Sequence, residues 1–71
     1  MSEEVTQKLS EYGAIFGDNV CLVFFLNGSG RVEIGIRGVR GFFVDSFDNV
    51  SEFLKKDVDN TLRLAKKYAW V

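Results

Sequence analysis

Seven consecutive apolar residues, Val20–Leu26, constrain this chain more than any other feature of its sequence. The run contains two valines and two phenylalanines, and β-branched and aromatic residues of this kind favour strands. Successive side chains of a strand point to opposite faces of the sheet, so this strand is apolar on both faces. The fold must therefore cover each face, or leave one of them to a partner.

Two turn signals after this run predict a three-stranded antiparallel sheet. Residues 27–30 read Asn-Gly-Ser-Gly, and Gly and Asn accept the positive φ angles that hairpin turns need. Residues 31–37 alternate polar and apolar side chains, which is typical of a strand with one buried face. Residues 38–41 supply two more glycines, and residues 42–44 are a third apolar segment. We expect a meander of strands over 20–26, 31–37 and 42–44.

The length of the first loop decides which side chains share a face. A loop of two or four residues within 27–30 pairs odd positions of the first strand with even positions of the second. The main core face then consists of Cys21, Val23, Phe25, Val32, Ile34 and Ile36. The opposite face is mixed and consists of Val20, Leu22, Phe24 and Leu26 beside Arg31, Glu33, Gly35 and Arg37. Depending on the second turn, Phe42 or Phe43 joins the mixed face over Gly35. A loop of three or five residues would reverse which residues of the first strand share a face with which residues of the second, but one face would still be purely apolar and the other mixed.

A helix is predicted at the N-terminus. Val5, Leu9, Tyr12 and Phe16 recur at intervals of four, three and four residues, which places them on one helix face. Ser2 is the expected N-cap, since its hydroxyl can accept a hydrogen bond from the first turn. We expect the helix to end between Tyr12 and Phe16, before a glycine-led turn into the sheet.

A second helical pattern covers the C-terminal region. Asp48 is the expected N-cap, with Ser46 and Ser51 as alternatives. The predicted buried stripe consists of Val50, Leu54, Val58, Leu62, Ala65 and Ala69. One continuous helix is the favoured interpretation, and a break with a restart at 57–60 is the alternative. Residues 1–71 are thus expected to form one α+β domain with the order α-β-β-β-α.

The mixed face of the sheet needs a cover, and two arrangements provide one. In the first, the N-terminal helix packs on the mixed face. In the second, both helices share the core face, and the mixed face binds a second copy of the chain or another protein. The residues expected to bind that partner are Leu22, Phe24, Leu26, Phe42 and Trp70. Trp70 either clamps the last helix to the sheet or anchors the partner, because Trp is enriched among interface hot spots.

The composition argues against catalysis, cofactors and membrane insertion. The 71 residues include no His and one Cys, which removes the usual general base, imidazole zinc sites and disulfide frameworks. We expect no enzymatic activity, no metal, no cofactor and no small-molecule substrate. The longest apolar run is too short to cross a bilayer, and the first four residues are too acidic for a signal peptide. A cytoplasmic location is expected.

Basic residues support an alternative function in nucleic-acid binding. The candidate phosphate contacts are Arg31, Arg37, Arg40, Lys66 and Lys67, with a sheet aromatic stacking on a base. Residues 34–41 resemble the I-G-x-x-G-x-x-I signature of KH domains, although here they run from a predicted strand into the turn before the next one, whereas the KH loop joins two helices. The order of elements resembles that of double-stranded-RNA-binding domains, although residues 48–52 are acidic where that family has a lysine pair. The net charge of −1 gives no general attraction to phosphate.

The sequence therefore favours a small non-enzymatic protein-interaction module, a regulator or inhibitor that binds a partner protein or forms a homodimer. Its size, its balanced charge and its lack of catalytic residues suit such a role. Small inhibitors encoded by viruses often share these features.

Overall fold

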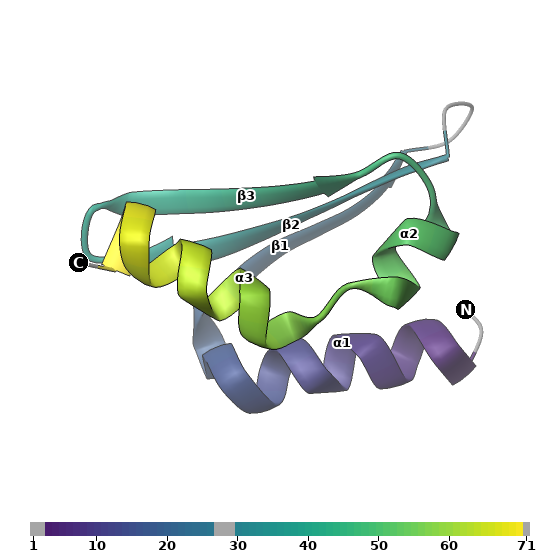
Figure 1. Cartoon of the computed structure of the whole chain (residues 1–71), viewed down its shortest axis with the longest axis horizontal. Helices are drawn as coiled ribbons and strands as arrows, with labels where there is room; N and C mark the ends of the chain where they lie inside the picture. The colour runs from purple at the N-terminus through teal and green to yellow at the C-terminus, as the bar shows by residue number, and fades with distance from the viewer. Residues whose placement is uncertain (1–2, 27–29, 71) are drawn as a thin grey trace.

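The chain forms one small α+β domain, shown in Figure 1. Its elements are α1 (Glu3–Phe16), the 3-10 turn η1 (Gly17–Asn19), β1 (Val20–Leu26), β2 (Arg31–Gly38), β3 (Gly41–Phe47), α2 (Val50–Lys55), α3 (Val58–Ala65) and the π-helical turn η2 (Lys66–Trp70). The computed structural model describes residues 3–26 and 30–70, with the side chains of residues 22, 25 and 26 left out. The expected α-β-β-β-α order is confirmed, but the C-terminal helical region is divided.

Helix α1 follows the predicted pattern. Val5, Tyr12 and Phe16 are its buried residues, and Glu3 and Glu4 lie in the first turn, where the helix dipole favours negative charge. The helix ends before Gly17, whose φ of +57° is a left-handed conformation that glycine adopts without strain. The predicted N-cap, Ser2, lies outside the described residues.

The described strands form a three-stranded antiparallel sheet with the order β1-β2-β3. Leu26 pairs with Arg31, so four residues separate these strands, which is one of the two loop lengths that set the predicted faces. Gly38 pairs with Gly41 across a two-residue turn. Strand β3 continues to Phe47, three residues beyond its predicted end, because it remains paired with β2 up to Val32.

A β-bulge near the start of β1 overturns the predicted positions of two residues. Val20 pairs with Ile36 and Leu22 pairs with Gly35, so Cys21 is the extra residue. Val20 consequently packs against the core, whereas the sequence pattern placed it on the mixed face. Cys21, expected in the core, instead turns its thiol toward the carbonyl of Gly35, with Sγ donating over 3.3 Å.

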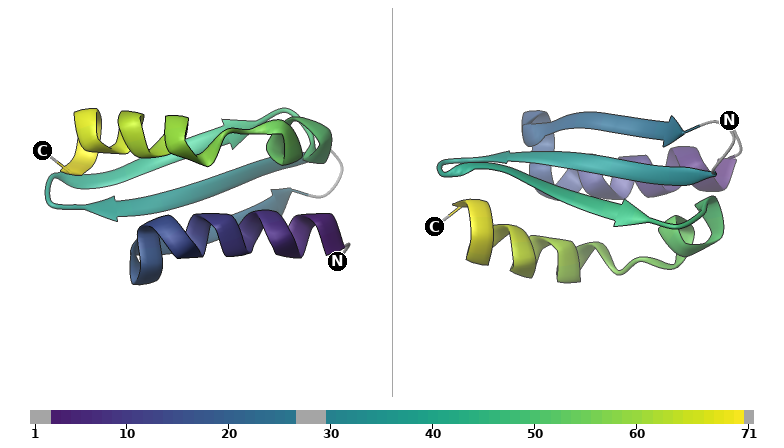
Figure 2. Two further views of the ribbon diagram at one scale, coloured as in Figure 1. Left: turned by 60° about the horizontal axis from the view of Figure 1, so that its bottom comes forward. Right: turned by 90° about the horizontal axis from the view of Figure 1, so that it is seen from above.

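Helix α1 and the C-terminal helices α2 and α3 pack on the same face of the sheet, which we call the inner face. Its central residues Val32, Ile34 and Ile36 are fully buried. In the left view of Figure 2, α1 and α3 both lie in front of the sheet. Tyr12 of α1 stacks on Phe53 of α2, with 6.0 Å between ring centroids, so one core joins the helices. The predicted arrangement with α1 on the mixed face is therefore wrong, and the helices share one face as in the alternative arrangement. The binding of a partner by the mixed face stays a prediction.

The C-terminal region is two short helices and a final turn, so the prediction of one continuous helix is wrong. Asn49, and not Asp48, caps α2, with its Oδ1 accepting from the Glu52 amide at 2.9 Å. Lys56 is extended (ψ 131°), and its carbonyl accepts a 2.8 Å hydrogen bond from Lys8 Nζ of α1. Asp57 then caps α3 through the Asp59 amide. This restart is the alternative that the sequence left open.

The break also shifts the buried stripe. Phe53 and Thr61 are fully buried although neither belonged to the predicted set, whereas Leu54 and Leu62 are only partly buried. Val58, Ala65 and Ala69 are buried as expected. Within the described residues, no helix is both long and apolar enough to cross a lipid bilayer.

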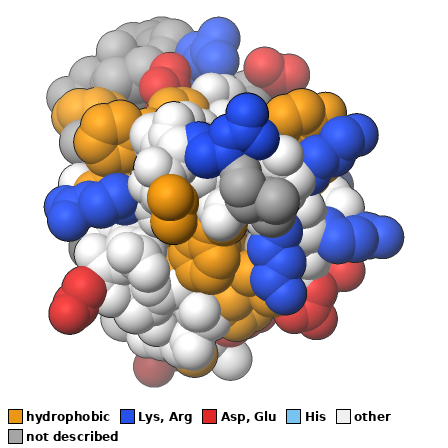
Figure 3. Space-filling view, turned by 90° about the vertical axis from the view of Figure 1, so that its left-hand side faces the viewer, with side chains coloured by type: hydrophobic (Ala, Val, Ile, Leu, Met, Phe, Trp, Pro, Cys, Tyr) orange, Lys and Arg blue, Asp and Glu red, His pale blue; other side chains and the backbone are white. Residues whose placement is uncertain are grey.

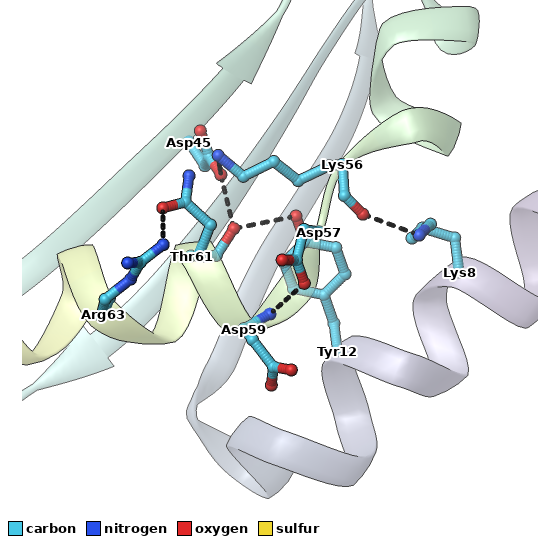
Figure 4. A network of polar contacts seen from close by, with 9 residues as sticks. Lys8, Tyr12, Asp45, Lys56, Asp57, Asp59, Thr61 and Arg63 are labelled. Carbon is cyan, nitrogen blue, oxygen red and sulfur yellow. Dashed lines mark hydrogen bonds and ion pairs between the residues drawn. The ribbon is translucent and has the colours of Figure 1, made fainter.

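A polar network ties the helices to the inner face (Figure 4). Asp45 of β3 accepts a 2.8 Å hydrogen bond from Thr61 Oγ1 of α3 and lies 3.4 Å from Lys56 Nζ. Thr61 Oγ1 lies 3.3 Å from the Tyr12 hydroxyl. Because Thr61 uses its only hydroxyl hydrogen on Asp45, Tyr12 donates to Thr61. Burial, assisted by the negative charge of Asp45, raises the pKa of Tyr12 to about 12.

Candidate functional site

The sheet face opposite the helices, which we call the outer face, is not covered by any described element. The described residues at its centre are Phe24, Glu33, Gly35, Arg37, Phe42 and Val44. Phe24 is 45% exposed, Val44 is 49% exposed and Phe42 is 68% exposed. Outside this face, the large apolar side chains that are exposed in the described structure are Val39 and Tyr68. The outer face therefore gathers most of the exposed apolar groups seen there.

A shallow depression lies in the middle of the outer face. It is lined by Cys21, Gly35, Arg37, Phe42 and Val44. Gly35 pairs with Val44 and Arg37 with Phe42, so the missing side chain of Gly35 opens the floor between larger neighbours. The register thus selects Phe42 for the outer face.

Phe43, the other residue considered for that place, lies on the inner face. Its ring stacks with Tyr68 at a centroid distance of 6.4 Å and an interplanar angle of 4°.

Charged side chains on the central strand β2 separate the apolar groups of β1 from those of β3 on the outer face. Glu33 pairs with Phe24 of β1, and Arg37 pairs with Phe42 of β3. Within the described part of the chain, no ion pair joins Glu33 or Arg37 to another residue. The face can therefore contribute apolar contacts from both edge strands and unpaired charges of both signs from β2.

The residues predicted to bind a partner fall into three groups. Phe24 and Phe42 are exposed on the outer face, as that prediction requires. Leu22 and Leu26 are described only by their backbones, which pair with Gly35 and Arg31, and their side chains lie outside the described structure. Trp70 lies elsewhere.

Trp70 clamps the end of the chain to the sheet. Its Nε1–H donates a 2.7 Å hydrogen bond to the carbonyl of Arg37, and its ring meets Phe16 edge-on at 5.4 Å. A Cβ on Gly38 would overlap the Trp70 ring, so this glycine is needed for the close approach. The structural interpretation of Trp70 therefore applies, and we do not place it in the candidate surface.

Most of the predicted basic residues gather at one end of the molecule. The Arg40 amide donates a 2.7 Å hydrogen bond to the carbonyl of Ala69, which holds the turn between β2 and β3 against η2. Lys66 and Lys67, both exposed, lie on η2. Figure 3 looks onto this end and shows Lys and Arg side chains around exposed hydrophobic ones.

Arg31 does not belong to this group. It lies six residues from Arg37 on β2, about 20 Å away at the usual rise of a strand.

Two residues of the outer face were missed by sequence reasoning. Val44 was not considered because the length of the second turn was left open. The glycines that flank a two-residue turn, Gly38 and Gly41, were the signal that would have paired it with Gly35. Cys21 was missed because no sequence pattern marked the bulge.

Comparison with protein families, curated proteins and solved structures finds no match to this chain.

Proposed function

We propose that this chain is a non-enzymatic protein-interaction module of the cytoplasm, a regulator or inhibitor that binds a partner protein through the outer face of its sheet. One observation carries the proposal: the helices all occupy the inner face, while Phe24, Phe42 and Val44 remain exposed on the outer face. Apolar groups gathered on one exposed face usually mark a contact surface.

The rigidity of the surface supports the same function. Phe24, Phe42 and Val44 project from paired strands, so little backbone order has to be gained when a partner binds. The Glu33 and Arg37 charges between them supply the polar groups that orient a partner without contributing much affinity.

Site-specific photo-crosslinking tests this function. A benzophenone side chain replaces Phe42 in one protein and Tyr68 in another. Tyr68 is the matched control, because it is an aromatic residue of similar exposure, 58% against 68%, that lies outside the outer face. We expect a discrete protein adduct at position 42 and none at position 68 after irradiation in cells. Equal labelling at the two positions, or no adduct at position 42, would contradict the proposal.

A second candidate function is binding of single-stranded nucleic acid at the basic end. The observation that favours it is the placement of exposed Phe42 beside Arg37, with Arg40 in the adjoining turn. A ring beside arginines allows a base to stack while phosphates are neutralised. The expected behaviour is an oligonucleotide affinity that falls steeply with salt and falls again in Arg37→Ala/Arg40→Ala. Absence of binding at low salt in a fluorescence anisotropy titration excludes this candidate.

A further inference from the structure

The arrangement of charge on β2 identifies the kind of partner that the outer face fits. Glu33 and Arg37 lie at equal distances on either side of Gly35 and on the same face of the strand. They are about 13 Å apart along the strand, too far for direct contact with each other. We propose that the outer face binds a second copy of this chain, with its β2 strand antiparallel, so that Glu33 of each copy meets Arg37 of the other. This inference rests on the proposed function and adds its partner.

Symmetry explains why these two charges fit a second copy. When two identical sheets pack face to face, their twofold axis lies in the plane between them. An axis that crosses the strands at Gly35 reverses the strand direction and brings Glu33 opposite Arg37 twice. An axis parallel to the strands places Glu33 opposite Glu33 and Arg37 opposite Arg37, which is repulsive. The charges therefore select the first arrangement.

The neighbouring strand β3 is compatible with the same axis. Val44 pairs with Gly35, so it lies on the axis and meets Val44 of the second copy. Phe42, two residues away, then faces Ser46 of the second copy, and no large side chain from Gly35 blocks the centre. Packed sheets lie about 10 Å apart and cross at about 30°, which displaces residues near the axis by only a few ångströms. The side chains of Glu33 and Arg37 are long enough to span that displacement.

The size of the face predicts a weak dimer. Strands of seven or eight residues at about 3.3 Å each, with about 4.8 Å between strands, give a face of roughly 14 by 23 Å. Two such faces amount to roughly 640 Å² of projected area, which is below the ~1,200 Å² of stable interfaces and in the range of weak, transient contacts. We therefore expect a dissociation constant of roughly 100 µM or more and a fast monomer–dimer exchange.

A charge-swap cycle measured by sedimentation tests this inference. The proteins are wild type, Glu33→Arg, Arg37→Glu and the double variant Glu33→Arg/Arg37→Glu. Each single change replaces two attractive pairs with two repulsive ones, so we expect the dissociation constant to rise roughly tenfold or more. The double variant restores both pairs with reversed polarity, so its dissociation constant should return to within about threefold of wild type.

Two variants of matched charge change provide the controls. Arg63→Glu lies on α3 and Glu4→Arg lies on α1, both exposed and both away from the outer face. Neither is expected to change the dissociation constant by more than about twofold. Circular dichroism confirms that every variant is folded.

The outcomes separate this inference from the proposed function. A wild-type chain that stays monomeric at all concentrations overturns the dimer, while an adduct of position 42 with a different protein would still support the interaction module. Single variants that dimerise like wild type, or a double variant that is not restored, overturn the antiparallel arrangement. Loss of dimer in both singles with recovery in the double variant confirms it.

Discussion

Thr61 of α3 donates a 2.8 Å hydrogen bond to Asp45 of β3, and this contact crosses from the helical layer to the inner face of the sheet. Tyr12 of α1 donates to the same threonine, and Lys56, at the break between α2 and α3, lies against the same carboxylate. All the helical segments involved are thus held on one side of the sheet. These contacts, together with the stacking of Tyr12 on Phe53, hold the helices on the inner face and leave the outer face uncovered.

Replacing Thr61 with valine keeps its shape and removes its hydroxyl. Tyr12 then loses its acceptor and Asp45 its shortest hydrogen bond, both in buried or nearly buried surroundings. We expect the free energy of unfolding to fall by about 1–3 kcal/mol in urea denaturation. Thr61→Ser retains the hydroxyl and loses only a buried methyl group, which costs about 1 kcal/mol. A serine variant as unstable as the valine variant would mean that packing and not the network dominates here.

Alkaline pH should weaken the fold through Tyr12. Its pKa is about 12 in the folded protein and 10.0 in the reference state, so folding disfavours its ionised form. The stability that Tyr12 contributes is fully present below pH 10 and is lost as the pH rises toward 12, because the unfolded chain releases the proton first. The slope is about 1.4 kcal/mol per pH unit between those values.

The Tyr12→Phe variant isolates this effect. The other titratable groups are common to both proteins, so the difference between their stability–pH curves belongs to Tyr12. We expect the difference to be flat below pH 10 and to decline above it. Parallel curves up to the highest measurable pH would show that the Tyr12 hydroxyl is more accessible than the structure indicates.

Gly38 and Gly13 should respond to alanine in opposite ways. A Cβ on Gly38 would overlap the Trp70 ring and lie 2.5 Å from the carbonyl oxygen of Ala69, so η2 must move off the sheet. A Cβ on Gly13 meets nothing within 4 Å. We expect Gly38→Ala to cost at least about 2 kcal/mol and Gly13→Ala, in the interior of α1, to gain up to about 1 kcal/mol. Similar melting temperatures for the two variants would contradict the close approach of Trp70.

Much of the fold was predictable because it follows from local periodicity. Val32, Ile34 and Ile36 alternate with polar residues, and this alternation alone identified the buried face of β2. Glycines in or beside each loop located the turns, but the register depended on loop lengths that the sequence left open.

The features that were mispredicted depend on contacts between segments distant in the chain. The break at Lys56 follows from its side chain meeting Asp45 and its carbonyl meeting Lys8, and neither contact is visible in a helical pattern. A polar residue such as Thr61 is expected on the surface, and its burial follows only from its contacts with Tyr12 and Asp45. The bulge at Cys21 shifts the pairing of β1 with β2, and nothing in the apolar run marks its position.

The candidate surface was predictable only in part for the same reason. Sequence alone indicated that β1 is apolar on both faces, but not which face α1 covers. The choice depends on contacts such as the stacking of Tyr12 on Phe53, which join the N-terminal helix to the C-terminal helical region. Phe24 was placed correctly on the outer face, whereas the choice between Phe42 and Phe43 needed the register of β3. The role of Trp70 was left between two alternatives, and its hydrogen bond to Arg37 resolved them.

The most direct test of the outer face as a binding surface is sedimentation velocity on wild type, Phe24→Asp and Val23→Asp. Concentrations from about 10 µM to about 1 mM cover the affinity expected of a small interface. Val23, the neighbour of Phe24 on the same strand, packs against the core, so an aspartate there should unfold the protein. We expect Phe24→Asp to remain folded by circular dichroism and to sediment as a monomer at concentrations where wild type is a dimer. A Phe24→Asp variant that unfolds like Val23→Asp, or that still dimerises as tightly as a dimeric wild type, would contradict a binding surface on the outer face.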